Sequence, residues 1–258
     1  MPALNLNYEK DGYFVEKGLF NRNELSAIQK ILENFHELWK AENSDFYQNK
    51  AINSAYLTGT KYLSSSDRRA LFQFIASKKI QAIVGSVIPT KPAFLNTQLF
   101  FDPFKAGQKN YWHRDLQYLG KPIEEQKKML NSINVIHFRI PLKQEYGIEI
   151  VPGSHKEWDT NVEFDIRTEA NGKKCFETLP TGKIVKLEPG DLMIFSANMI
   201  HRGLYGLDRL SFDIIFCDSD PELVKHAELD TLPNEVDIQN IEFPNCFLNT
   251  IKLKNQYS

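Results

Sequence analysis

A succession of short β-rich runs, each followed by turn residues, constrains the fold of this chain more than any other feature. Eight such runs lie between Phe94 and Cys217, and they are rich in β-branched and aromatic residues. We expect strands at residues 95–101, 111–118, 133–142, 148–151, 183–187, 192–196, 200–203 and 209–217. Eight antiparallel strands of this kind predict a double-sheet jelly roll, an architecture whose open mouth accepts small ligands.

Helical patterns precede the β-rich part of the chain. Asn21 and Glu24 have the spacing of a capping box, and apolar residues then recur at helical spacing. A second helical stretch is expected over about 66–87, with a break near Ser77, where the apolar face shifts. Residues 41–61 have no clear period, so we expect a loop there.

No repeat, low-complexity tract or composition shift divides the chain. We therefore expect one domain over residues 1–258, with a helical part at about 20–90 and a jelly-roll core at about 94–217. The segment at about 218–258 is less regular and is expected to wrap the outside of the barrel. A hydrophobic content of 42%, with 18 Phe and 10 Tyr, is enough for a sizeable core.

Charge and composition argue against several classes of function. The 31 basic and 33 acidic side chains give a net charge of −2, so no overall field favours nucleic acid or an anionic membrane. The first residues lack the basic flank and apolar run of a secretion signal, and no apolar stretch is long enough to span a bilayer. The three well-separated cysteines favour reduced thiols. We therefore expect a cytoplasmic protein.

A His-x-Asp pair followed by a distant histidine carries the clearest chemical signal. Alternate side chains of a strand share a face, so His113 and Asp115 are expected to point the same way, and a strand carrying His201 could complete a three-ligand site. Two imidazoles and one carboxylate suit a non-heme Fe(II) that activates O₂. Such a pair also occurs by chance in many strands. The aromatic surroundings of Asp115 strengthen the metal interpretation, because an unpaired buried carboxylate is costly.

Four landmarks fall in an order that is typical of one enzyme family. They are Asp11-Gly-Tyr-Phe-Val-Glu-Lys-Gly-Leu-Phe20, Trp112-His113-Arg114-Asp115, Val151-Pro-Gly-Ser-His155, and Gly190-Asp191 leading to His201. Together they cover roughly residues 8–217 and resemble the phytanoyl-CoA dioxygenase family of Fe(II)/2-oxoglutarate oxygenases. The resemblance implies a double-stranded β-helix, a cupin-like jelly-roll barrel that is mainly β with flanking α-helices. It also implies that His113, Asp115 and His201 hold Fe(II), and that 2-oxoglutarate and O₂ are consumed.

The resemblance further implies a co-substrate site on the last expected strand. Arg209 and Ser211 share one face of that strand, and in the resembling family an Arg here binds the distal carboxylate of 2-oxoglutarate, often with a nearby hydroxyl. A planar guanidinium suits this task because it can bind a carboxylate through two hydrogen bonds. The alternative is a surface ion pair with Asp208 or Asp213. Gln98 is a further candidate for contact with the co-substrate.

His137 and Arg139 share a face of the expected 133–142 strand, in a segment with which the resembling family lines its pocket. Many relatives have an aromatic residue there. If both side chains point inward, this departure indicates a polar or anionic substrate; the alternative is that both lie on the solvent face. Glu149 carries the same ambiguity, and His155 is expected to fix its loop rather than to bind metal.

These features predict a 2-oxoglutarate-dependent hydroxylase of a small polar or anionic metabolite, with release of succinate and CO₂. The presence of Asp115 favours hydroxylation over halogenation, because halogenating relatives have a small residue in its place, whereas desaturation, ring closure and epoxidation remain open. Two other classes remain open: a non-oxidative metal-binding jelly roll, such as a small-ligand sensor or carbohydrate binder, and a Zn²⁺-dependent isomerase or hydrolase. Arg209 with Ser211 favours the oxygenase, because a binding module has no need of a dicarboxylate clamp beside its metal.

Overall fold

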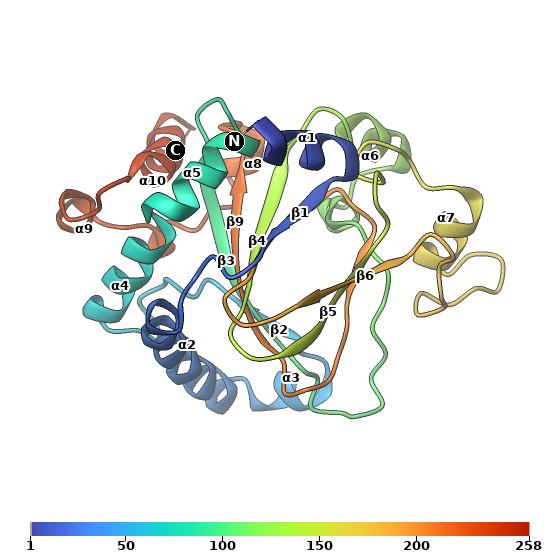
Figure 1. Cartoon of the computed structure of the whole chain (residues 1–258), viewed down its shortest axis with the longest axis horizontal. Helices are drawn as coiled ribbons and strands as arrows, with labels where there is room; N and C mark the ends of the chain where they lie inside the picture. Colours follow the sequence, from blue (N-terminus) through green and yellow to red (C-terminus); the bar gives the residue numbers. More distant parts are fainter. Residues whose placement is uncertain (1, 258) are drawn as a thin grey trace.

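Two antiparallel sheets lie at the centre of the computed structural model, which describes residues 2–257 (Figure 1). In spatial order, the larger sheet consists of β1 (Tyr13–Glu16), β7 (Leu192–Ser196), β4 (Val135–Pro141), β9 (Leu210–Cys217), β3 (Ala93–Phe101) and β2 (Asn53–Ala55). The smaller sheet consists of β6 (Lys183–Leu187), β5 (Glu145–Ile150) and β8 (His201–Gly203). The predicted jelly-roll barrel with flanking helices is confirmed.

Helices from both ends of the chain flank this barrel (Figure 1). The N-terminal helices are α1 (Pro2–Asp11), α2 (Arg22–Glu42), α3 (Ser44–Asn49), α4 (Ser65–Ile75) and α5 (Lys78–Val87). The later helices are α6 (Ile123–Met129), α7 (Asn161–Thr168), α8 (Pro221–Val224), α9 (Glu235–Gln239) and α10 (Asn245–Tyr257), with short 3₁₀ turns at Asp115–Leu119 and Leu229–Thr231. In Figure 1, α2, α4, α5, α9 and α10 lie to one side of the sheets, and α6 and α7 lie to the other.

The strand periodicity divides the larger sheet into an outer and an inner face. On β4, Ile136 and Phe138 belong to the main hydrophobic core, which also includes buried residues of α2, α4, α5 and α10. On the neighbouring β9, Phe212 and Ile214 belong to the same core. The residues between them on both strands therefore face the interior of the barrel. This alternation brings polar side chains into the barrel.

Local signals in the sequence explain both principal helical regions. The Asn21 side chain accepts hydrogen bonds from the backbone N–H groups of Asn23 and Glu24, and the Glu24 carboxylate accepts one from the Asn21 N–H. This is the predicted capping box. The break expected near Ser77 is also present, because Ser77 separates α4 from α5.

The prediction of a strand at residues 111–118 is wrong. Only His113 pairs with another strand, in an isolated bridge to His201, and a 3₁₀ turn begins at Asp115. Arg114 explains the departure, because its buried guanidinium donates to the Asp159 carboxylate and to the Ser154 carbonyl, outside the β ladder. His113 and Asp115 therefore come together through a bridge and a turn, not through strand alternation.

Two irregular segments contain more structure than the sequence predicts. Residues 41–61, expected as a loop, contain α3 and β2, and β2 pairs with β3. The C-terminal segment contains α10, in which Thr250 donates a hydrogen bond of 2.6 Å to the Phe94 carbonyl on β3. Phe247 of the same helix packs against Phe94, with ring centroids 4.9 Å apart.

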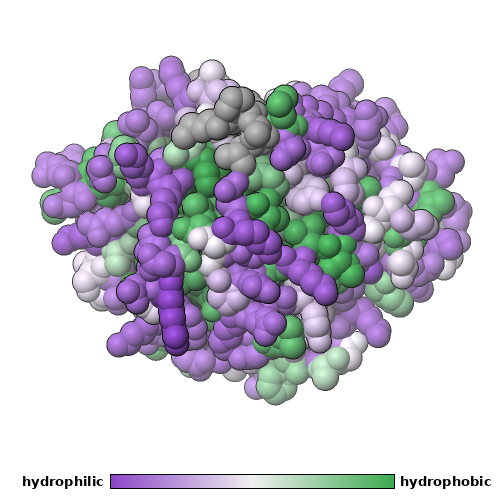
Figure 2. Space-filling view, in the orientation of Figure 1, coloured by the Kyte–Doolittle hydropathy of each residue, from purple (hydrophilic) through white to green (hydrophobic). Residues whose placement is uncertain are grey.

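The outer surface is mostly polar on the face that carries β1 and β6. Figure 2 shows hydrophilic side chains over most of this face, with hydrophobic ones scattered between them. Within residues 2–257, no helix combines the length and apolar character that crossing a membrane requires.

Candidate active site

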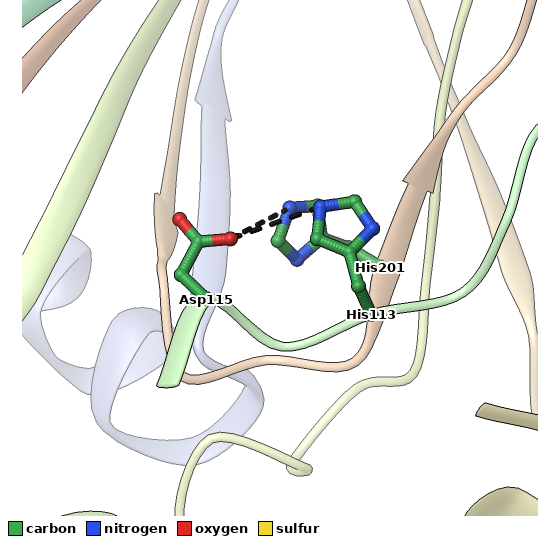
Figure 3. A group of neighbouring side chains, drawn as sticks. All are labelled: His113, Asp115 and His201. Carbon is green, nitrogen blue, oxygen red and sulfur yellow. Dashed lines mark ion pairs between the residues drawn. The ribbon is translucent and has the colours of Figure 1, made fainter. Parts of the chain in front are cut away.

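Three side chains from two distant segments of the chain converge in the barrel (Figure 3). His113 and His201 lie side by side on their bridge, and Asp115 faces both imidazoles from the start of the 3₁₀ turn. The Oδ1 atom of Asp115 lies 3.7 Å from His113 Nε2 and 3.8 Å from His201 Nε2. One ligand atom of each residue lies within 4.8 Å of the other two, so a single ion can contact all three after small side-chain adjustments.

Both imidazoles are oriented for metal binding by the backbone. His113 Nδ1 lies 3.1 Å from the Tyr111 carbonyl, and His201 Nδ1 lies 3.0 Å from the Met199 carbonyl. A proton on each Nδ1 satisfies these contacts and leaves the Nε2 lone pair for a metal. Burial lowers the pKa of His113, and burial with the neighbouring His113 lowers the pKa of His201 to about 3. Both rings are therefore neutral ligands near pH 7.

Asp115 is the ionised member of the donor set. Burial alone would raise its pKa, but a hydrogen bond from His137 and the nearby imidazoles lower the pKa below its usual range. The donor set is thus two neutral imidazoles and one carboxylate on one side of the ion. This combination fits a non-heme Fe(II) with open positions for other ligands.

A cavity of about 370 Å³ extends from these three residues into the barrel. Its polar wall residues include Asn53, Gln98, Asn110, Tyr111, His137, Arg139, Tyr205, Arg209 and Asp213. Apolar residues such as Phe100, Ile148 and Phe195 complete the wall. The expected residues Gln98, His137, Arg139 and Arg209 therefore share one cavity with the three candidate metal ligands.

Arg209 is a buried cation without an ion-pair partner among the described residues. It is 2% exposed, and its Nε has no hydrogen-bond partner within the part of the chain that the structure describes. Among the described residues, its Nη1 and Nη2 atoms donate only to the carbonyls of Leu204, at 3.4 Å, and Phe101, at 3.2 Å. Burial and the nearby Arg139 lower its pKa to about 10, so it remains cationic near pH 7.

The alternative of a surface ion pair for Arg209 is wrong, because Arg209 is 2% exposed and neither Asp208 nor Asp213 pairs with it among the described residues. Asp208 pairs with Lys143, and Asp213 pairs with Arg139. Gly203 also leaves room for the Arg209 guanidinium, because a Cβ at Gly203 would collide with Nη1. The arrangement therefore holds a cation available for an anionic ligand.

Comparison with known proteins assigns the family. A family model described as Phytanoyl-CoA dioxygenase (PhyH) matches residues 8–204. The chain belongs to this family of Fe(II)/2-oxoglutarate oxygenases. The resemblance that the four sequence landmarks indicate is confirmed, and iron and 2-oxoglutarate are the cofactors that family membership implies. No curated protein matches the chain significantly.

Solved structures share the fold of this phytanoyl-CoA dioxygenase family member. AviO1 from Streptomyces viridochromogenes Tue57 is 16% identical, with a TM-score of 0.58 over 84% of this chain and 94% of that chain. EctD from S. alaskensis in its apo form is 13% identical, with a TM-score of 0.61 over 85% and 77% of the two chains. The carbocyclase SnoK from nogalamycin biosynthesis is 13% identical, with a TM-score of 0.57 over 85% of each chain. EctD itself has been solved with bound Fe, and with 2-oxoglutarate and 5-hydroxyectoine.

The Ser211 side chain does not line the cavity, although the sequence places it beside Arg209 at the co-substrate site. It is fully buried, its hydroxyl donates to the Glu145 carboxylate, and it is not part of the cavity wall. Glu145 also accepts two hydrogen bonds of 3.2 Å from Arg139. The Ser211 hydroxyl is thus engaged within the protein, so the structure does not support the expected contact of Ser211 with the co-substrate.

His137 and Arg139 face the cavity, so the solvent-face alternative is wrong. They are 3% and 2% exposed. Their charges, however, are offset: His137 contacts the carboxylates of Asp115 and Asp213, and Arg139 contacts those of Asp213 and Glu145. The cationic wall expected from the sequence is therefore compensated by carboxylates.

Glu149 and His155, which the sequence singled out, lie outside the cavity. Glu149 is buried in an ion pair with Arg202, with Oε2 2.6 Å from Nη2, so it supports the smaller sheet. His155 packs against Tyr8, with ring centroids 6.1 Å apart, and is not a ligand of the candidate metal site. This placement agrees with the expected structural role of His155.

Sequence reasoning did not assign Asp213, Glu145 and Tyr205 to the site. Asp213 follows Ser211 by two residues on β9, so strand alternation could have placed it in the barrel. Glu145 lies on β5 of the other sheet, and its contact with Ser211 depends on how the sheets face each other. Tyr205 lies in the loop before Arg209, with its ring centroid 5.3 Å from the guanidinium carbon, and no local pattern indicates this position.

Proposed function

We propose that this protein is an Fe(II)- and 2-oxoglutarate-dependent oxygenase that hydroxylates a small molecule. The observation that carries the proposal is the buried Arg209 guanidinium, which has no ion-pair partner among the described residues and lies in the same cavity as His113, Asp115 and His201. A dicarboxylate that contacts the metal at one end and Arg209 at the other would satisfy both ends of the cavity.

The protein's own residues would bind and orient the reactants. His113, Asp115 and His201 would hold iron on one side, and Arg209 would fix the distal carboxylate of 2-oxoglutarate. When bound there, iron with O₂ would supply the oxidation, in which 2-oxoglutarate becomes succinate and CO₂ and one oxygen atom is transferred to the substrate. The buried walls, including Phe195 and Ile148, would exclude water from the reacting atoms.

A second cavity supports a specific place for the substrate. It has a volume of about 220 Å³, and it shares Asp115, His137 and Gln98 with the first cavity. Its wall includes the aliphatic side chains of Leu95, Leu116, Leu119, Ile133, Val135, Ile215 and Leu223. We infer that the carbon to be oxidised enters from this side, opposite the Arg209 end of the barrel.

The character of this second cavity bears on the substrate class. The sequence indicates a polar or anionic substrate because of His137 and Arg139, but both contact carboxylates inside the protein. Aliphatic walls instead favour an apolar portion of the substrate beside the metal. Asn96 and Tyr56 also line this cavity and would contact a polar group of the substrate. We therefore propose a small amphipathic substrate.

The experiment that tests the oxygenase is 2-oxoglutarate turnover without added substrate. Purified protein with Fe(II), O₂ and 2-oxoglutarate should release succinate slowly, and the release should require oxygen and Asp115. Zn²⁺ in place of Fe(II) should abolish it, because Zn²⁺ has no redox chemistry. A protein that binds metal at the three residues but forms no succinate under any of these conditions would instead be the sensor or the zinc enzyme.

A further inference from the structure

His137 is held between two carboxylates inside the barrel. Its Nε2 lies 2.9 Å from Asp115 Oδ2, and its Nδ1 lies 3.2 Å from Asp213 Oδ2. The ring also stacks on Phe195, with centroids 4.8 Å apart and planes 16° apart. Contacts on both nitrogens and one ring face fix the position of the imidazole.

This contact gives the two oxygens of Asp115 different surroundings. Oδ1 faces the Nε2 atoms of His113 and His201, at 3.7 and 3.8 Å, whereas Oδ2 accepts the hydrogen bond from His137. A carboxylate that is free at both oxygens can rotate or bind a metal through both. With Oδ2 engaged, Asp115 offers one oxygen to the ion.

The far side of His137 is supported in turn. Asp213 is fully buried, and Arg139 Nη1 lies 3.3 Å from its Oδ1, so the carboxylate is held from two directions. Asp213 pairs with Arg139 across β9 and β4, which fixes both residues by the register of the sheet. His137 is therefore held in position without Asp115, and its hydrogen bond can fix the orientation of the Asp115 carboxylate.

We propose that His137 is a positioning residue that keeps Asp115 as a one-oxygen ligand of the metal, with Asp213 as its support. The inference rests on the proposed iron site and deepens it. Partners that hydrogen-bond a metal ligand typically change metal affinity by about 10–100-fold when they are removed. His137 would thus contribute to metal binding without contacting the ion.

Two substitutions of similar length separate a hydrogen-bonding role from a packing role. His137→Met removes the donor to Asp115, whereas His137→Gln retains an amide that can donate. Co(II) accepts the same donor set as Fe(II) and reports its coordination through its visible absorption spectrum. We expect His137→Met to weaken Co(II) binding by about 10–100-fold and to alter the spectrum. His137→Gln should restore most of the affinity.

A buried histidine outside the cavity provides the matched control. His155 is 5% exposed, so His155→Gln removes a buried imidazole without touching the metal site, and Co(II) affinity should not change. Circular dichroism and thermal melting establish that each variant is folded. If folded His137→Met binds Co(II) as the unsubstituted protein does, or if Met and Gln lower the affinity equally, the inference is wrong.

Failure of the inference differs from failure of the proposed function. The titration needs neither 2-oxoglutarate nor turnover, so a protein that forms no succinate can still show the expected difference between His137→Met and His137→Gln. Absence of any Co(II) binding by the unsubstituted protein would overturn both proposals. Succinate formation with unchanged metal affinity in His137→Met would overturn only the positioning role.

Discussion

Replacing Arg209 with alanine tests the assignment of the co-substrate site most directly. Arg209 is 2% exposed and has no ion-pair partner among the described residues, so the substitution removes a buried cation without leaving a carboxylate unpaired. The substitution also removes the hydrogen bonds to the Phe101 and Leu204 carbonyls and enlarges the cavity, so the free energy of unfolding should fall modestly while the protein stays folded. Binding of 2-oxoglutarate should instead weaken strongly.

The burial of Arg209 sets the size of the effect. A carboxylate bound to it would be desolvated, and removing one partner of a buried ion pair costs roughly 3–5 kcal/mol. At about 1.4 kcal/mol for each factor of ten, the affinity for 2-oxoglutarate should fall by about 10² to 10³ or more. Arg209→Lys should give an intermediate loss, because lysine keeps the charge but not the planar fork.

Two measurements check this prediction: the 2-oxoglutarate dependence of succinate formation, and calorimetric titration of 2-oxoglutarate into the Co(II)-loaded protein. Gly203→Ala is an independent control, because its Cβ would displace the guanidinium while leaving the charge in place. It should weaken 2-oxoglutarate binding but not metal binding. An Arg209→Ala protein with unchanged co-substrate dependence would refute the reasoning.

Further substitutions test the other parts of the barrel. Asp115→Ala should abolish metal binding and succinate formation with little change in melting temperature; retained turnover would exclude Asp115 as a ligand. Arg139→Leu should lower the free energy of unfolding in urea by roughly 3–5 kcal/mol, because it leaves Glu145 without its cation. Val135→Phe should fill the aliphatic cavity and abolish substrate stimulation while basal succinate formation persists. Burial and Lys40 lower the pKa of His36 to about 4, below the unfolded value of 6.5. The unfolded state therefore binds more protons between these values, and the free energy of unfolding should fall as pH decreases from about 6.5 to 4. His36→Phe should reduce this pH dependence by roughly 1–2 kcal/mol, allowing for partial exposure.

Local sequence patterns predicted much of the fold because their causes are local. The strands at 183–187 and 192–196 have the expected bounds, and the capping box at Asn21 starts α2. The prediction of a strand at 111–118 was wrong because of a contact between residues far apart in the sequence. Arg114 donates to Asp159, forty-five residues away, and this burial removes the segment from the ladder after one bridge. No pattern within the segment itself indicates that contact.

The candidate metal ligands were predictable because residue type and spacing restrict their chemistry. The sequence indicated Arg209 as a co-substrate ligand through the resemblance, and this role stays a prediction; that Arg209 lies in the same cavity and has no ion-pair partner among the described residues appears only in the structure. The contact between Ser211 and Glu145 could not be predicted from the sequence, because it joins the two sheets. The sequence placed His137 and Arg139 on one face of a strand but left open whether that face points inward, and the hydrogen bond from His137 to Asp115 depends on the turn that replaces the expected strand.

The distribution of charge inside the barrel argues for two ligands and not one. Asp213, Glu145 and Arg139 form a buried network, and well-packed apolar residues in their place would often be as stable or more so. The two carboxylates of this network have cationic partners, whereas Arg209 has no anionic partner among the described residues. Asp115 at the other end offers Oδ1 to a cation. A metal ion alone would compensate only the charge of Asp115, and a free dicarboxylate alone would compensate only the charge of Arg209. The two ends of the cavity are satisfied together when a dicarboxylate bound at Arg209 also reaches a metal held beside Asp115.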